Sequence, residues 1–420
     1  MAVLPIIVIV CTTGIIRYMS KTWLSPGAFF GLCWSFFLIV PVIFTQDYRL
    51  DQVGLWYIAV FTMAIGAGSV VAFRHLPIDN SRILDPLIKT ELKAIKTTFI
   101  IFNLISIVGI ILLFSYATST YSVGYYTNGW MSIPNLIAID RYGGNLNYPF
   151  VIKYSLYFIY PANLIGGLIM GFSHGPVRMK LLWFTPLLLA LLLGIIEGAR
   201  SSILLGLVLF FSSWLSAFMY EKNKKTKNNL LLKLALGSGT FILIFTGFFI
   251  LIQWLRQGMD TIIIDLLLSK IQAYFFGYLS AFTQWAGQLG QFEWKSGLTT
   301  FAGPFNLVGI MERPLGFYDP VNISNGISTN IFTAFRGLIV DFSISGSIAL
   351  AFIFGFMVQL IFQKEIKQSL IHIIPISMFY AFTLYSPLIS IFHYNSILFS
   401  WVAISIPILL SKNGSMAYNS

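Results

Sequence analysis

Arginine residues beside apolar segments are the groups in this sequence whose chemistry is most specific. Arg336 stands at the start of a long apolar run, and Asp341 follows it near the same end. Charge at the mouth of a membrane helix is costly and indicates a functional site. Four more arginines fall on the side of the membrane to which Arg336 is assigned below: Arg141, Arg200, Arg256 and Arg313. A guanidinium stays charged in a low-dielectric environment and binds phosphate through paired hydrogen bonds, so the set predicts a site for a phosphate-bearing substrate.

Two simpler interpretations compete with this one. Asp341 could cap the N-terminus of its helix, where the helix dipole favours an anion, with Arg336 as its neighbour. Glu197 and Arg200 are three residues apart in the turn GIIEGARSS and could form an ordinary ion pair. Neither interpretation explains why several arginines lie on one side.

Other groups on that side could assist the arginines. Tyr318 and other aromatic residues could stack on sugar rings, although Trp and Tyr are common at every membrane interface. His393, in IFHYNS, could bind a phosphate or a hydroxyl, or make an ordinary polar contact. The carboxylates available for proton transfer are Asp140, Glu293, Glu312, Asp319 and Asp341. The sequence has no HExxH, paired-His, GxSxG or P-loop motif, so it predicts no metal, no nucleotide and no other cofactor.

The composition excludes a soluble globular protein. The 420 residues are 57% hydrophobic and only 10% charged, whereas ordinary globular chains carry about a quarter charged residues. Apolar runs of about 17 to 25 residues, the length that a bilayer requires, recur throughout. We therefore expect an all-α polytopic integral membrane protein that forms a single transmembrane domain, 1–420. Cys11 and Cys33 lie in apolar runs and are expected to pack as small hydrophobic side chains.

Eleven spanning helices are predicted, and Lys and Arg residues assign their sides. The segments are Val3–Ile16, Pro26–Thr45, Val53–Phe73, Thr97–Ala117, Val151–Phe172, Leu181–Ile196, Ser201–Tyr220, Leu230–Trp254, Gly337–Phe362, Ser369–Ser390 and Ile397–Leu410. Every second connection is rich in Lys and Arg, which places it in the cytoplasm, with the N-terminus outside and the C-terminus inside. The first run has no basic residues before it, so we expect a retained helix rather than a cleaved signal peptide.

The two longest connections lie outside by this assignment, at 118–150 and between the eighth and ninth helices at 255–336. Within the second, 260–285 is apolar enough to suggest a further span. Spanning would bury Asp265 and Lys270 and reverse the side of everything that follows. We therefore expect an interfacial or re-entrant helix there, with the spanning alternative left open.

Two short segments carry a resemblance to a known family. TNIFTAFRGLIVDFSISG, at Thr329–Gly346, resembles the signature of oligosaccharide repeat-unit polymerases, the Wzy-type O-antigen polymerases. GARSSILLGL resembles the Gly-x-Arg that opens a mid-chain helix in the same family. Family members tend to show Asp-Phe-Gly before a membrane helix. Here the triplet is Asp341-Phe342-Ser343, and the next glycine is Gly346.

The resemblance implies a GT-C-like membrane glycosyltransferase of the bacterial inner membrane. Such an enzyme moves a growing glycan from its undecaprenyl-pyrophosphate carrier onto an incoming lipid-linked repeat unit at the periplasmic face, with a chain-length regulator protein as a partner. Arg200 and Arg336 would hold the pyrophosphate, assisted by Arg141 and Arg256. Asp341 would orient Arg336 or accept the proton of the attacking hydroxyl. The further substrate contacts would be Arg313, Tyr318 and His393.

Three other functions fit parts of the pattern. An O-antigen ligase shares the architecture and the arginines, but passes the finished glycan to the lipid A core. A lipid-linked oligosaccharide flippase would need charged residues deep within several helices, whereas the predicted spans have almost none. A structural membrane subunit would leave the one-sided arginines unexplained.

Overall fold

The chain folds almost entirely into helices. The computed structural model describes residues 3–75, 86–172, 177–220, 247–256, 264–288, 294–312, 318–324, 326–363 and 369–417. Within these ranges, seven helices are long and apolar enough to cross a membrane: Val3–Ser20, Pro26–Phe44, Gln52–Phe73, Ile88–Thr120, Phe150–Phe172, Arg200–Phe218 and Ala334–Gln363. Four shorter apolar helices are Thr185–Ile196, Gly247–Arg256, Leu370–Tyr385 and Asn395–Ser411. This agrees with the predicted all-α class of polytopic membrane protein, while the number of eleven spans stays a prediction.

Several helix boundaries differ from the predicted ones, with local causes. Helix α4 (Pro86–Thr120) begins well before Thr97, because a helix with three lysines on its first turns was interpreted as a loop. The predicted span Val151–Phe172 is interrupted between α7 (Phe150–Tyr157) and α8 (Ile159–Phe172). Pro161 lacks the N–H that would continue the helix across Phe158. Most of the predicted span Leu230–Trp254 lies outside the described residues.

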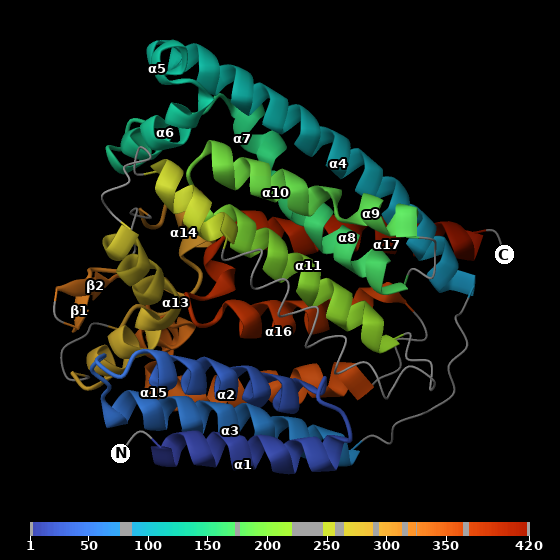
Figure 1. Cartoon of the computed structure of the whole chain (residues 1–420). Coiled ribbons are helices and arrows are strands. Elements are labelled where there is room, and N and C mark those ends of the chain that lie inside the picture. The colour runs from blue at the N-terminus through green and yellow to red at the C-terminus, as the bar shows by residue number, and fades with distance from the viewer. Residues whose placement is uncertain are drawn as a thin grey trace. The chain divides into compact units, whose positions relative to one another are not determined.

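Contacts divide the chain into two compact units, of which unit 1 comprises Met1–Glu91 and Ser269–Ser420. Its helices α1 (Val3–Ser20), α2 (Pro26–Phe44), α3 (Gln52–His75) and α15 (Ala334–Gln363) lie side by side (Figure 1). The α3–α15 pair packs through glycine, since a Cβ at Gly68 or Gly355 would collide with the backbone of the other helix. Unit 1 ends with η5 (Leu370–His372), α16 (Ile373–Tyr385), η6 (Ile391–His393) and α17 (Asn395–Ala417).

The long connection before α15 also contributes ordered structure to unit 1. It contains α13 (Ile264–Ala286), α14 (Ala302–Leu307) and an antiparallel hairpin of β1 (Val321–Ser324) and β2 (Ile327–Thr329), which the sequence did not predict. Helix α13 lies along the end of α2, since Tyr278 Oη donates to the carbonyl of Phe37 and Gln272 Nε2 to that of Phe44. Helix α13 is not among the seven long apolar helices, and whether it spans stays open.

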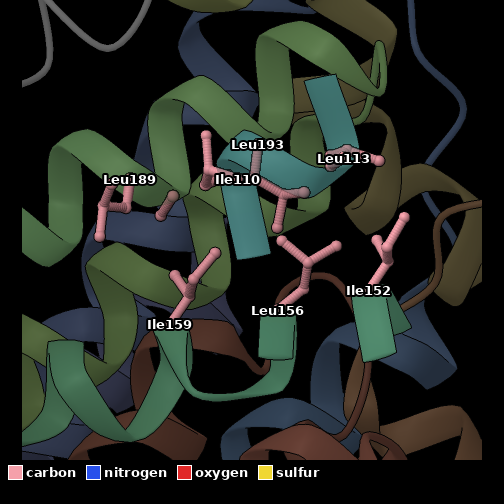
Figure 2. Packing of buried hydrophobic residues seen from close by; sticks show 8 residues of the cluster. Ile110, Leu113, Ile152, Leu156, Ile159, Leu189 and Leu193 are labelled. Carbon is pink, nitrogen blue, oxygen red and sulfur yellow. The ribbon is translucent and has the colours of Figure 1, made fainter. Parts of the chain in front are cut away.

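Unit 2 comprises Leu92–Leu268. Besides most of α4, α7, α8 and the helix Gly247–Arg256, it holds α5 (Ser122–Asn128), η1 (Trp130–Ser132), α6 (Ile133–Tyr142), α9 (Val177–Trp183), α10 (Thr185–Ile196) and α11 (Arg200–Tyr220). A buried aliphatic cluster joins α4, α7, α8 and α10, with Ile110, Leu156 and Leu193 turned toward one another (Figure 2). Helices α8 and α11 approach closely, because Gly167 leaves no room for a side chain against the carbonyl of Phe210. This packing holds the turn that precedes Arg200.

Candidate functional site

The first turns of α15 place Arg336 inside a group of aromatic rings. Its Cζ atom lies 4.0 Å from the ring centre of Phe332, 4.1 Å from that of Tyr318 and 5.2 Å from that of Trp285. These distances are within the range of cation–π attraction. The neighbouring Phe335 is fully buried and packs against Trp34, which fixes the helix and directs Arg336 to its other side.

The guanidinium of Arg336 has no hydrogen-bonded or ion-paired acceptor among the described residues. The charge of Asp319 acts on it without forming an ion pair. Thr300 and Thr333 are almost fully buried, and neither hydroxyl has a hydrogen-bond partner in the described part of the chain. A Cβ on Gly337 would lie 3.5 Å from Tyr318 Oη and 3.6 Å from Thr300 Oγ1, so these two hydroxyls converge on the helix one residue after Arg336.

Tyr318 contributes a neutral hydroxyl to this group. Burial raises the pKa of Tyr318, and the charge of Asp341 raises it further, while Arg336 opposes the shift. The phenol therefore keeps its proton at neutral pH and can donate a hydrogen bond. A positive group with rings around it and a phenol beside it is suited to an oxyanion.

Asp341 is fully buried and does not pair with Arg336. Its carboxylate accepts the backbone N–H of Thr299 at 3.0 Å and that of Thr300 at 2.5 Å. Five residues separate Arg336 from Asp341, so on a helix the two side chains point about 140° apart. Asp341 therefore does not cap the N-terminus of α15, as the simpler interpretation expected, but binds backbone amides of the loop that precedes α14.

Helix α15 is kinked at Ser343, where φ is 63° and ψ is 174°. Only glycine adopts this region readily. Ser343 Oγ accepts the N–H of Gly346 at 3.2 Å and so caps the second half of the helix. Just before the kink, the carbonyl of Val340 accepts the N–H of Lys295 at 3.0 Å, and that of Asp341 accepts Nε1 of Trp294. Ser343 thus occupies a position whose positive φ favours glycine.

His393 lies against the same loop. It is 1% exposed, and its Nδ1 is 3.2 Å from the carbonyl of Thr299. In the next turn Asn395 Nδ2 donates to the carbonyl of Gly303 at 3.0 Å. The segment 294–303 is thus held by α15 on one side and by the α16–α17 connection on the other.

In unit 2, Arg200 is the first residue of α11, and its guanidinium lies 4.5 Å from the ring centre of Phe249. The ion pair that the spacing of Glu197 and Arg200 suggested is not formed. Glu197 instead pairs with Arg141, with 3.2 Å between Oε2 and Nη2. Burial raises the pKa of Glu197, and Arg141 opposes the shift.

The segment 118–150 contacts this turn through the Arg141–Glu197 pair and at Gly198, and it is held in place by further contacts. Tyr121 Oη donates to Asp140 at 2.6 Å, and burial together with this bond raises the pKa of Tyr121. The guanidinium of Arg256 lies 4.7 Å from the ring centre of Tyr142. Gly198 has φ of 60°, and a Cβ there would lie 2.8 Å from the carbonyl of Pro134, so only glycine fits between α6 and the turn.

The predicted site residues thus fall into two sets. Unit 1 brings Arg336 and Tyr318 together and binds Asp341 and His393 to one loop, whereas unit 2 holds Arg141, Arg200 and Arg256. Arg313 lies outside the described residues. Sequence reasoning missed Thr299, Thr300, Phe332 and Thr333. The only signal for the loop residues was the uncharged stretch SGLTTFAG between charged neighbours.

Comparisons with protein-family models, with curated proteins and with solved structures gave no match.

Proposed function

We propose that the protein is a polysaccharide repeat-unit polymerase of the O-antigen polymerase type, a GT-C-like glycosyltransferase with eleven spans in the bacterial inner membrane. Its donor is a glycan on undecaprenyl pyrophosphate, and its acceptor is an incoming lipid-linked repeat unit at the periplasmic face. The N-terminus is periplasmic and the C-terminus cytoplasmic. The observation that carries the proposal is the Arg336 guanidinium, which lies among three rings and has no hydrogen-bonded or ion-paired acceptor among the described residues.

The chemistry of the transfer requires a positive group where the leaving group departs. The bond between the anomeric carbon and the pyrophosphate oxygen breaks, the acceptor hydroxyl oxygen bonds to that carbon, and the hydroxyl proton is released. Negative charge therefore grows on the pyrophosphate. A preorganised guanidinium at that point stabilises the transition state, and this kind of electrostatic term is often the largest in catalysis. The hydroxyl of Tyr318, whose ring lies 4.1 Å from the guanidinium carbon, supplies an additional donor.

Asp341 takes the positioning role in this proposal. Both carboxylate oxygens already accept backbone N–H groups, so Asp341 holds the loop 294–300 against α15. His393 supports the same loop from the α16–α17 connection. Neither residue is assigned as the acceptor of the hydroxyl proton.

Arg200 and Arg256 of unit 2 are included as phosphate-binding residues on the sequence argument. Arg141 has a carboxylate partner in Glu197, so its charge is partly neutralised. We therefore expect a smaller loss of activity from Arg141→Ala than from Arg336→Ala.

The test is the surface-glycan ladder of a null strain restored with variants of the gene. Arg336→Ala should abolish long chains at an unchanged protein level. Arg336→Lys should restore them only in part, because an ammonium lacks the planar paired donors of a guanidinium. Arg49→Ala, which removes an exposed arginine of the same unit, is the matched control and should leave the ladder intact. An unchanged ladder in Arg336→Ala would remove the proposal.

The same strain separates the polymerase from the ligase. Loss of a polymerase leaves a single repeat unit on the lipid A core, whereas loss of a ligase leaves the core bare. If the null strain has a bare core, the assigned function changes from polymerase to ligase. The leaving group is then the same, and the acceptor is the lipid A core.

A further inference from the structure

A stretch of unit 1 outside the spanning helices exposes large apolar side chains. Residues 296–311 contain no charged residue, and Lys295 and Glu312, both exposed, flank them. This stretch forms α14 and the turn that follows. Its apolar residues are among the more exposed of the chain, with Leu307 at 73%, Val308 at 67% and Ile310 at 61%. A contiguous exposed group of this kind in a folded protein indicates an interaction surface.

The anchors of α14 indicate the depth at which this surface lies. Helix α14 packs against η6 and the start of α17. Asn395 Nδ2 donates to the carbonyl of Gly303, and Gly303 is so close to the carbonyl of His393 that a Cβ there would collide with it. These contacts fall between the end of one apolar helix, Leu370–Tyr385, and the start of the next, Asn395–Ser411. The ends of membrane helices lie where hydrocarbon gives way to lipid headgroups.

We infer that residues 301–311 form a membrane-inserted tip, with Leu307, Val308 and Ile310 among the outermost acyl segments of the lipid. An apolar turn at this level is stabilised by lipid in the way that an interfacial helix is. Lys295 and Glu312 stay in the headgroup layer at the two ends of the tip. The same piece of chain carries Thr299 and Thr300, whose amides bind Asp341, so lipid contact at the tip restrains the loop beside Arg336. The inference does not depend on the proposed function.

The test measures lipid contact at single positions. In full-length protein with Cys11→Ala and Cys33→Ala, Val308→Cys is labelled with an environment-sensitive fluorophore and reconstituted at one copy per lipid nanodisc. Leu307→Cys serves in its place if the first variant is not monodisperse. Ser328→Cys, exposed on β2, is the aqueous control, and Ile353→Cys, exposed at 54% near the middle of α15, is the control for the bilayer interior.

The expected result is a blue-shifted emission at 308 that is quenched by lipid spin-labelled near the headgroup more strongly than by lipid labelled near the chain end. The label at 353 should show the opposite order, and the label at 328 should show no quenching. Emission at 308 that matches 328 would overturn the inference. A blue shift at 308 without quenching by either lipid would also overturn the inference, because protein would then cover the tip. The covering protein would be a second copy if the shift arises only in discs that hold two copies, and otherwise another part of this chain.

Discussion

Replacing Ser343 by glycine should stabilise the protein. The φ of 63° and ψ of 174° at this residue lie in a region that costs a residue with a Cβ about 1–3 kcal/mol. Glycine removes this cost. It also loses the cap that Ser343 Oγ provides to the N–H of Gly346, worth only a few tenths of a kcal/mol for a change to glycine. Glycine also gives the unfolded chain more conformational freedom, which lowers the free energy of unfolding of the variant by roughly 0.5–1 kcal/mol. The net expectation is a gain on the order of 1 kcal/mol.

Ser343→Ala is the matched control because it keeps the strain and loses the cap. A change from serine to alanine at a cap costs about 0.5–2 kcal/mol. The expected order of stability is therefore glycine, then serine, then alanine. The measurement is the unfolding midpoint in an SDS titration of the purified protein, followed by tryptophan fluorescence.

Equal midpoints for Ser343→Gly and Ser343→Ala would refute the reasoning, because both lack the hydroxyl and differ only in the backbone freedom at this position. A glycine variant less stable than the natural chain would also refute it. The glycan ladder should be unchanged in the glycine variant, since the backbone geometry that it adopts is the one already present.

Two further substitutions test the buried carboxylates. Asp341→Asn leaves one acceptor oxygen for two backbone amides and should lower the unfolding midpoint by the equivalent of about 1.5–3 kcal/mol; an unchanged midpoint would show that the amides of Thr299 and Thr300 do not depend on the charge. Burial raises the pKa of Glu197 in the folded protein, whereas the pKa in the unfolded chain is about 4.3. At pH values between these two pKa values, Glu197 is protonated in the folded protein and ionised in the unfolded chain. Stability should therefore rise as the pH falls through that window, and Glu197→Gln should remove the slope; the same slope in the variant would assign it to another group.

Much of the architecture follows from hydrophobic length alone. Each predicted span overlaps an apolar helix, because about 20 apolar residues in a bilayer must satisfy their own backbone hydrogen bonds. The interruption at Phe158 and the early start of α4 were missed for different reasons. Pro161 breaks a run whose hydropathy is continuous, whereas Lys89, Lys93 and Lys96 continue a helix whose hydropathy falls.

The site was only partly predictable, because its partners come from distant segments. Arg336 was identified by its type and position. Its rings come from α13, from the segment before β1 and from the residues before α15, and no spacing rule connects them. The partners of Asp341 are backbone amides, and every residue except proline offers one. Sequence patterns carry no signal for contacts of this kind.

The kink at Ser343 links these features into one arrangement. A straight helix would satisfy the carbonyls of Val340 and Asp341 internally, but beside the kink they accept donors from Lys295 and Trp294. The loop that supplies these donors therefore lies next to Asp341. The Asp341 carboxylate accepts two further hydrogen bonds from backbone amides of this loop. A carboxylate satisfied in this way is not available to neutralise Arg336, and the helical spacing turns the two side chains apart. The guanidinium lies among three rings, where the charge of Asp319 acts on it without forming an ion pair, and we propose an anionic ligand as its partner.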